Sequence, residues 1–104
     1  MSGKADRDAG RPIIGLLTIE LHFPEAQSLK AKRMVVKSLK ERLQQRFRVS
    51  VAETRHQDVW TRAELTAAVV TTDRGQADSI LDKLDTFVER DGRAIILRVE
   101  RSFR

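Results

Sequence analysis

The chain has 104 residues and no cysteine, and its 20 Lys+Arg against 15 Asp+Glu give a formal net charge of +5 at pH 7. A chain of this length folds around one core, because about 100 residues bury roughly two-thirds of the surface that the unfolded chain exposes. The lack of cysteine excludes disulfide scaffolds and thiolate metal sites, and it fits a reducing compartment. No apolar run approaches the roughly 18 residues of a membrane span, and the N-terminus lacks the apolar stretch of a signal peptide, so we expect a soluble, cytoplasmic protein.

The N-terminal residues 1–11 (MSGKADRDAGR) mix opposite charges with two glycines and contain no large apolar side chain after the initiator methionine. Such a segment buries too little apolar surface to offset the entropy lost on ordering. We therefore expect a disordered leader over residues 1–11, followed by a single domain over residues 12–104.

The periodicity of the remaining sequence predicts six elements. They are a strand, a helix, two strands, a helix and a strand, over residues 13–23, 28–47, 49–58, 62–72, 74–90 and 94–103. The strands alternate apolar and polar residues, whereas the helices repeat apolar residues about every 3.6 positions. Ser28 has the side chain of an N-cap, and Gly92 ends the second helix because glycine adopts a left-handed backbone. The few residues around 59–61 are short enough for a hairpin turn.

This βαββαβ order, with two right-handed crossovers around a central hairpin, predicts an α+β ferredoxin-like sandwich. We expect a four-stranded antiparallel sheet with both helices on one face. On the open face of the first strand we place Thr18, Glu20 and His22. The third strand offers no aromatic residue on either face, so we do not expect bases to stack on the sheet as they do on RNA-recognition motifs.

The first helix is strongly basic, with eight Lys and Arg and the single acid Glu41 between residues 30 and 48. At about 100° per residue, Lys30, Arg33, Lys37 and Lys40 lie within about 80° of one another and form a stripe that suits phosphate groups. The candidate RNA-binding residues are this stripe and two neighbours: Lys30, Lys32, Arg33, Lys37, Lys40 and Arg48. A solvated helix face is the alternative interpretation, and Lys32 lies near the apolar arc, where it can extend past the sheet edge.

The second helix carries the opposite charge. Its acids outnumber Lys83, and they are Asp78, Asp82, Asp85 and Glu89. The sequence therefore predicts a basic side and an acidic side, so the net charge understates the local field.

A second candidate site lies at the hairpin tip, where His56, Gln57, Asp58 and Trp60 combine polar groups with the sole tryptophan. Large polar and aromatic residues in a turn often make contacts, so we assign these residues to partner contact. Two alternatives stay open. Trp60 could pack over the sheet end, or Asp58 could orient the His56 imidazole for acid–base chemistry, because alternate residues of a strand share a face.

We predict neither an enzyme nor a cofactor. No serine or cysteine nucleophile accompanies His56 and Asp58, and the chain has no phosphate-cradling glycine motif. His22 and His56 lie far apart in sequence, without the spacing of metal ligands, so no metal site is expected either.

Several segments resemble the YlxP-like proteins of bacteria, a domain family of uncharacterised function. They are GLLTIELHFPEAQSLKAKRMVVKSLKERLQQRF, VSVAETRHQDVWTRAELTAAVV and ILDKLDTFVERD, within a similarity that spans residues 14–103. The resemblance implies a ferredoxin-like fold. It also implies a ribosome-related role, because genes of this family often neighbour those of translation-initiation and ribosome-maturation factors. It supplies no catalytic residues.

Two functions of different kinds follow from these observations. The first is a non-enzymatic accessory factor that binds ribosomal RNA or a ribosomal subunit through the basic helix, with the hairpin tip touching the same partner. The alternative is a protein-interaction module, such as a homodimer paired through its sheets, with no role in nucleic-acid binding. For the alternative, the mixed open face of Glu20, His22, Arg98 and Glu100 would suit self-association.

Overall fold

Six elements follow one another in the predicted order. The structure is a computed structural model that describes residues 11–104, so the expected leader lies outside the described residues except for Arg11. The elements β1, α2, β2, β3, α3 and β4 cover Ile13–His22, Leu29–Phe47, Ser50–Arg55, Arg62–Thr71, Arg74–Asp91 and Ile95–Phe103. Each predicted boundary agrees to within one residue, except the end of the second strand.

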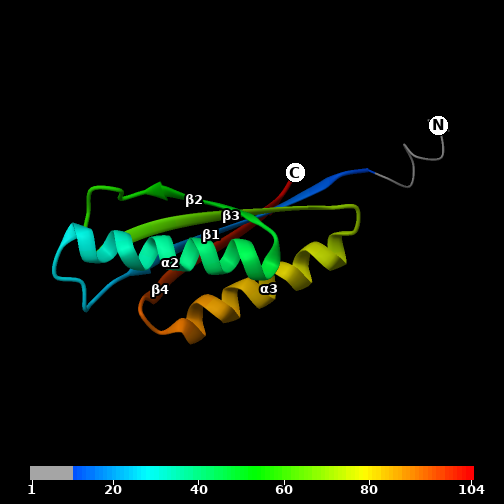
Figure 1. Cartoon of the computed structure of the whole chain (residues 1–104). Helices are drawn as coiled ribbons and strands as arrows, with labels where there is room; N and C mark the ends of the chain where they lie inside the picture. The colour runs from blue at the N-terminus through cyan, green and yellow to red at the C-terminus, as the bar shows by residue number, and fades with distance from the viewer. Residues whose placement is uncertain (1–10) are drawn as a thin grey trace.

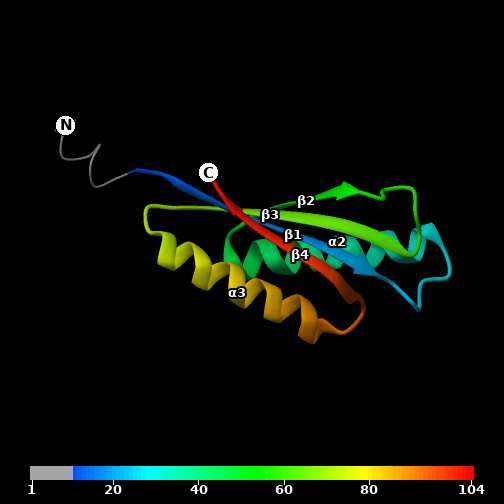
Figure 2. The same ribbon diagram turned by 180° about the vertical axis from the view of Figure 1, so that it is seen from behind.

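The strands form one antiparallel sheet in the order β2-β3-β1-β4. Both helices cover the same face of this sheet, as Figure 1 shows, and the opposite face is open in the reverse view of Figure 2. The predicted α+β ferredoxin-like fold is therefore confirmed. In the described residues, no helix is long and apolar enough to cross a membrane.

The predicted caps define where the helices begin and end. The Ser28 hydroxyl accepts a hydrogen bond from the Ala31 N–H at 3.0 Å, and the Asp73 carboxylate accepts one from the Gly75 N–H at 3.1 Å. Each bond satisfies one of the N–H groups that a helix start leaves without a partner. Gly92 ends α3 with a φ of 77°, in the left-handed region that glycine adopts without strain.

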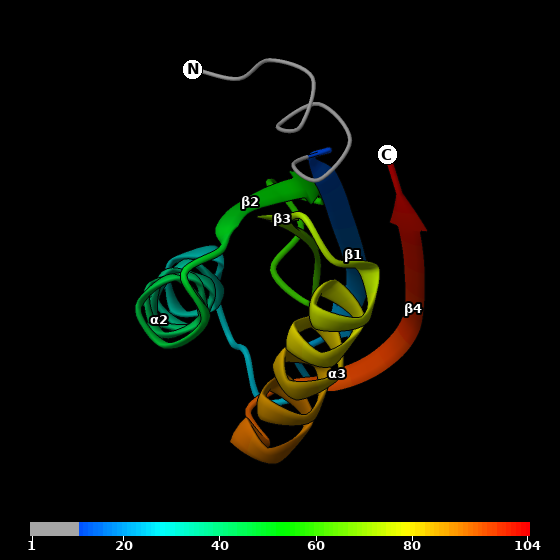
Figure 3. The same ribbon diagram turned by 90° about the vertical axis from the view of Figure 1, so that its right-hand side faces the viewer.

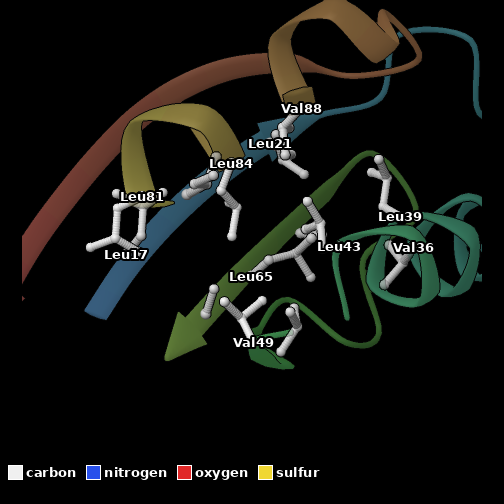
Figure 4. Packing of buried hydrophobic residues seen from close by; sticks show 14 of the residues in the cluster. Leu17, Leu21, Val36, Leu39, Leu43, Val49, Leu65, Leu81, Leu84 and Val88 are labelled. Atoms are coloured by element: carbon white, nitrogen blue, oxygen red, sulfur yellow. The ribbon is translucent and has the colours of Figure 1, made fainter. Parts of the chain in front are cut away.

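The core fills the space between the sheet and the helices (Figure 4). The central strands β1 and β3 bury alternate residues toward the helices, such as Leu17 and Leu65. α3 packs on β1 and β3, and α2 packs beside β2. Gly15 of β1 lets α3 come close, because a Cβ there would lie 3.2 Å from Leu81 Cδ1 and 3.2 Å from Val69 Cγ1.

The hairpin between β2 and β3 differs from the prediction. The second strand ends at Arg55 rather than Asp58, because His56 takes a left-handed backbone with a φ of 67°. The register between β2 and β3 also shifts between Glu53 and Arg55. Residues 56–61 therefore form a longer turn, and His56 and Asp58 do not share a strand face.

The strand β4 lies at one edge of the sheet (Figure 3). All of its residues are at least partly exposed, whereas β1 and β3 bury every second residue. The helices cover β4 only in part, since Ile96 and Phe103 pack against the core while Ile95, Leu97 and Val99 are exposed.

Candidate functional site

The structure contradicts the prediction that Lys32 of the basic helix is one of the RNA-binding residues. Its side chain is 0% exposed, so it cannot join the phosphate-binding stripe and does not extend into solvent. Its position in the sequence explains this burial, because Lys32, Val36, Leu39 and Leu43 recur at helical spacing and all four are buried.

Four oxygen atoms surround the Lys32 ammonium group. Nζ donates to Glu53 Oε2 at 2.8 Å and to the His56 carbonyl at 2.9 Å. The carbonyls of Arg62 and Gln57 lie at 3.2 Å and 3.4 Å. A buried ammonium needs a counter-charge and acceptors for its donors, and here Glu53 and the turn backbone provide them. Lys32 thus ties α2 to β2, to the turn and to the start of β3.

Further hydrogen bonds fix the turn at its two ends. The Val59 N–H donates to the His56 carbonyl at 3.0 Å, and Gln57 Nε2 donates to the Glu53 carbonyl at 3.1 Å. At the other end, the Thr61 carbonyl accepts a hydrogen bond of 2.9 Å from the Phe23 N–H. The turn is therefore held by α2 on one side and by the end of β1 on the other.

The stripe on α2 borders this turn. Lys30, Arg33 and Lys37 are exposed and Lys40 is partly exposed. Arg33 Nη2 lies 3.8 Å from Asp58 Oδ1, which links the stripe to the turn at the surface. A shallow groove runs between the two, and it is lined by Arg33, Lys37, Lys40, Gln44, Glu53 and Gln57, among others. The fold thus joins two regions that the sequence analysis treated as separate candidates into one surface.

The other turn residues face solvent. Trp60 is 47% exposed and does not pack away over the sheet end, while Val59 beside it is 39% exposed. Gln57 and Asp58 are exposed and His56 is partly buried. The surface next to the stripe therefore offers both polar groups and an aromatic ring.

The ion pairs leave the two helices with different electrostatic fields. Among residues 11–104, Lys30, Lys37 and Lys40 have no carboxylate oxygen within 4.0 Å. On α3, by contrast, Arg101 pairs with both Asp78 at 3.0 Å and Asp82 at 2.9 Å. Three of the four cations of the stripe are thus outside any ion pair in the described residues, while Arg33 approaches Asp58 and part of the acidic face of α3 is neutralised by Arg101.

Arg48 lies at the end of α2 that is farther from the turn. It is the C-cap of α2, with a φ of 53°, and lies 18 residues after Lys30, or about 27 Å along a helix. Its neighbours in a separate shallow groove include Pro12, Phe47 and Val70. That Arg48 contributes to RNA binding together with the stripe stays a prediction.

Comparison with known proteins places the chain in a family. A family described as "Protein of unknown function (DUF503)" matches residues 14–101. The chain belongs to this family. The "Uncharacterized protein YlxP" of Bacillus subtilis (strain 168) is 35% identical over 77 residues, covering 74% of this chain and 84% of the Bacillus protein. The resemblance to YlxP-like proteins is confirmed, and neither description names an activity or a partner.

The match to the family includes the whole of α2 and the whole β2–β3 turn, so the candidate surface lies within the family domain.

Glu53, the counter-ion of Lys32, was not predicted from the sequence. A signal was present, because a lysine in the middle of an apolar helical face requires a carboxylate nearby. The sequence gives no indication of which carboxylate this is.

A second basic groove was also missed. It lies between the C-terminal halves of α2 and α3 and includes Arg42, Arg46, Lys83 and Arg90. At its base Phe47 and Phe87 meet edge to face with centroids 5.8 Å apart, and the Arg46 guanidinium lies 5.6 Å from the Phe87 centroid. Two aspartates, Asp82 and Asp91, also line this groove, so it is less uniformly positive than the stripe.

Proposed function

We propose that this protein is a non-enzymatic accessory factor that binds RNA on the ribosome through one surface. The stripe of Lys30, Arg33, Lys37 and Lys40 would contact the phosphate backbone. The turn over residues 56–60 would touch the same RNA or an adjoining ribosomal protein. The observation that carries this proposal is the continuity of the stripe with the turn, fixed by the buried Lys32.

The charge and spacing of the stripe support contact with a phosphate backbone. Four cations extend over eleven residues of one helix, from Lys30 to Lys40, which is about 15 Å. Their side chains are long enough to reach a row of phosphates, and each contact would release a condensed counter-ion. The groove beside them contains amides, Gln44 and Gln57, that can donate to phosphate oxygens.

The turn supports a contribution beyond the phosphates. Exposed aromatic rings next to basic residues stack on unpaired bases, and each stacked base contributes about 1–3 kcal/mol by alanine substitution. Trp60 is the exposed aromatic residue of this turn. The open face of the sheet presents Thr18, Glu20, Thr66 and Glu64 instead, which supports RNA contact at the helix and turn rather than on the sheet.

The salt dependence of RNA binding tests the proposal. We expect the protein to bind a fluorescently labelled RNA stem-loop, with log K falling against log salt at a slope of about −3 to −4, as four phosphate contacts require. Replacing Lys30, Arg33, Lys37 and Lys40 with glutamine should weaken binding at low salt at least tenfold and bring the slope close to zero.

A second variant with the same loss of charge serves as the control. It replaces Arg11, Lys83, Arg90 and Arg104, which are exposed residues outside α2, with glutamine. This control should keep the slope of the unmodified protein, because its phosphate contacts are intact. Equal weakening in both variants would show that only net charge matters, and it would contradict the proposed surface.

A further inference from the structure

The edge strand β4 exposes three apolar side chains, on both sides of the β-bulge in its pairing with β1. Ile95 is 52% exposed, Leu97 49% and Val99 38%. In Figure 3 the outer side of β4 faces away from the rest of the sheet and from both helices. Natural proteins usually protect an edge strand with charge, proline or a covering segment, because its unpaired backbone groups attract another strand. An edge of this kind is where strand addition takes place.

The hydrogen bonds to β1 determine which backbone groups of β4 point outward. The N–H and carbonyl of Arg104 both bond to Ile14, at 2.9 Å and 3.0 Å. In an antiparallel pair such residues alternate with residues whose N–H and carbonyl point away. From the register, the backbone groups that point toward β1 are those of Ser102, Glu100 and Arg98. The backbone groups that point outward are those of Phe103, Arg101 and Val99.

The charges of β4 select one register for self-pairing. Two copies related by a two-fold axis pair antiparallel. A residue that lies a given number of positions before the axis is therefore opposite the residue that lies the same number of positions after it in the second copy. An axis at Arg98 or at Glu100 would place like charges opposite each other, which is destabilising. An axis at Val99 places Arg98 opposite Glu100 of the second copy, and this pair occurs twice. Val99 also has outward backbone groups, so this register forms hydrogen bonds across the axis.

We propose that β4 pairs antiparallel with β4 of a second copy of this chain, around an axis at Val99. The two sheets then join into one continuous sheet, and the exposed Leu97 and Val99 become covered. The β-bulge between Glu20 and Leu21 in the β1–β4 register confines the pairing to the part of β4 after Ile96. Because α2 packs beside β2 at the opposite edge, the basic stripe stays free in the dimer. The dimer does not depend on the proposed RNA binding.

Sedimentation equilibrium of the full chain tests this proposal. The unmodified protein should show twice the chain mass at high concentration and dissociate on dilution. Arg98→Glu or Glu100→Arg alone places like charges opposite each other at both symmetric positions, so each should weaken dimerisation by about tenfold or more. A monomer at every concentration up to the millimolar range would overturn the proposal.

Mixing the two single variants separates the interface from the fold. Within one strand, Arg98 Nη2 pairs with Glu100 Oε1 at 2.5 Å, and each single variant loses this pair. In an equal mixture, however, the Val99 register places opposite charges across the axis again, so the mixture should dimerise about as tightly as the unmodified protein and more tightly than either variant alone. Dimers of unchanged affinity in either variant alone, or no dimer in the mixture, would show that this register is wrong.

Discussion

At the scale of single residues, Lys32 is the most consequential side chain of the molecule. Its ammonium group neutralises Glu53 and binds carbonyls of the turn, so it supports both the fold and the proposed surface. Removing one partner of a buried ion pair leaves the other charge without compensation, which costs about 3–5 kcal/mol.

We therefore predict that Lys32→Met lowers the free energy of unfolding by about 3 kcal/mol in urea titrations. Lys37→Met is the matched control, because it makes the same substitution at an exposed position of the same helix, and it should change stability by less than about 0.5 kcal/mol. Equal losses in the two variants would mean that the oxygen cage around Lys32 contributes no stability.

At the scale of elements, Asp91 joins the end of α3 to its surroundings. Its carboxylate accepts from Arg93 Nε at 2.7 Å and Arg93 Nη2 at 2.9 Å, and Arg42 of α2 approaches to 3.4 Å. The hydrogen bonds from Arg93 hold the pKa of Asp91 below its usual value. A carboxylate with a lowered pKa in the folded state contributes stability above its unfolded pKa, and this contribution is lost as the pH falls through the folded pKa.

Asp91→Asn should consequently lower the free energy of unfolding by about 1.5–3 kcal/mol at neutral pH. The difference from the unmodified protein should shrink as the pH falls below about 4, because the carboxyl group of the unfolded chain protonates first and that of the folded protein protonates at a still lower pH. Unfolding titrations across this pH range measure both effects. Asp58→Asn is the control, since the Asp58 side chain is 95% exposed and should show neither effect. A cost that is the same at all pH values would contradict the ion-pair explanation.

The helices and strands can be predicted from the local sequence. Which of their side chains become buried against one another cannot. Alternation and helical spacing predict every strand and helix, because side-chain periodicity is a local property. The end of β2 depends instead on the left-handed His56 and on Lys32, whose partners come from distant parts of the chain. Likewise, the sequence does not show that β4 lies at an edge of the sheet with every residue at least partly exposed. Its exposure results from where α3 packs, and no local pattern encodes this.

At the scale of the whole molecule, charge and apolar exposure lie on different edges. The basic stripe and the turn lie at the β2 edge of the sheet. The exposed Ile95, Leu97 and Val99 lie on β4, at the opposite edge. A partner bound at one edge would leave the other accessible. RNA binding and self-association would therefore be independent, and a variant of one surface should leave the other function unchanged.

Co-sedimentation with the purified small and large ribosomal subunits is the direct test of ribosome binding by the basic stripe. The unmodified protein, a variant with Lys30, Arg33, Lys37 and Lys40 changed to glutamate, and the Arg11, Lys83, Arg90 and Arg104 glutamine variant are compared at low and moderate salt. We predict that the unmodified protein and the control variant, with glutamine at positions outside α2, pellet with one subunit. The variant with glutamate in the stripe should stay in the supernatant. If the unmodified protein stays in the supernatant with both subunits even at low salt, the ribosomal function is contradicted.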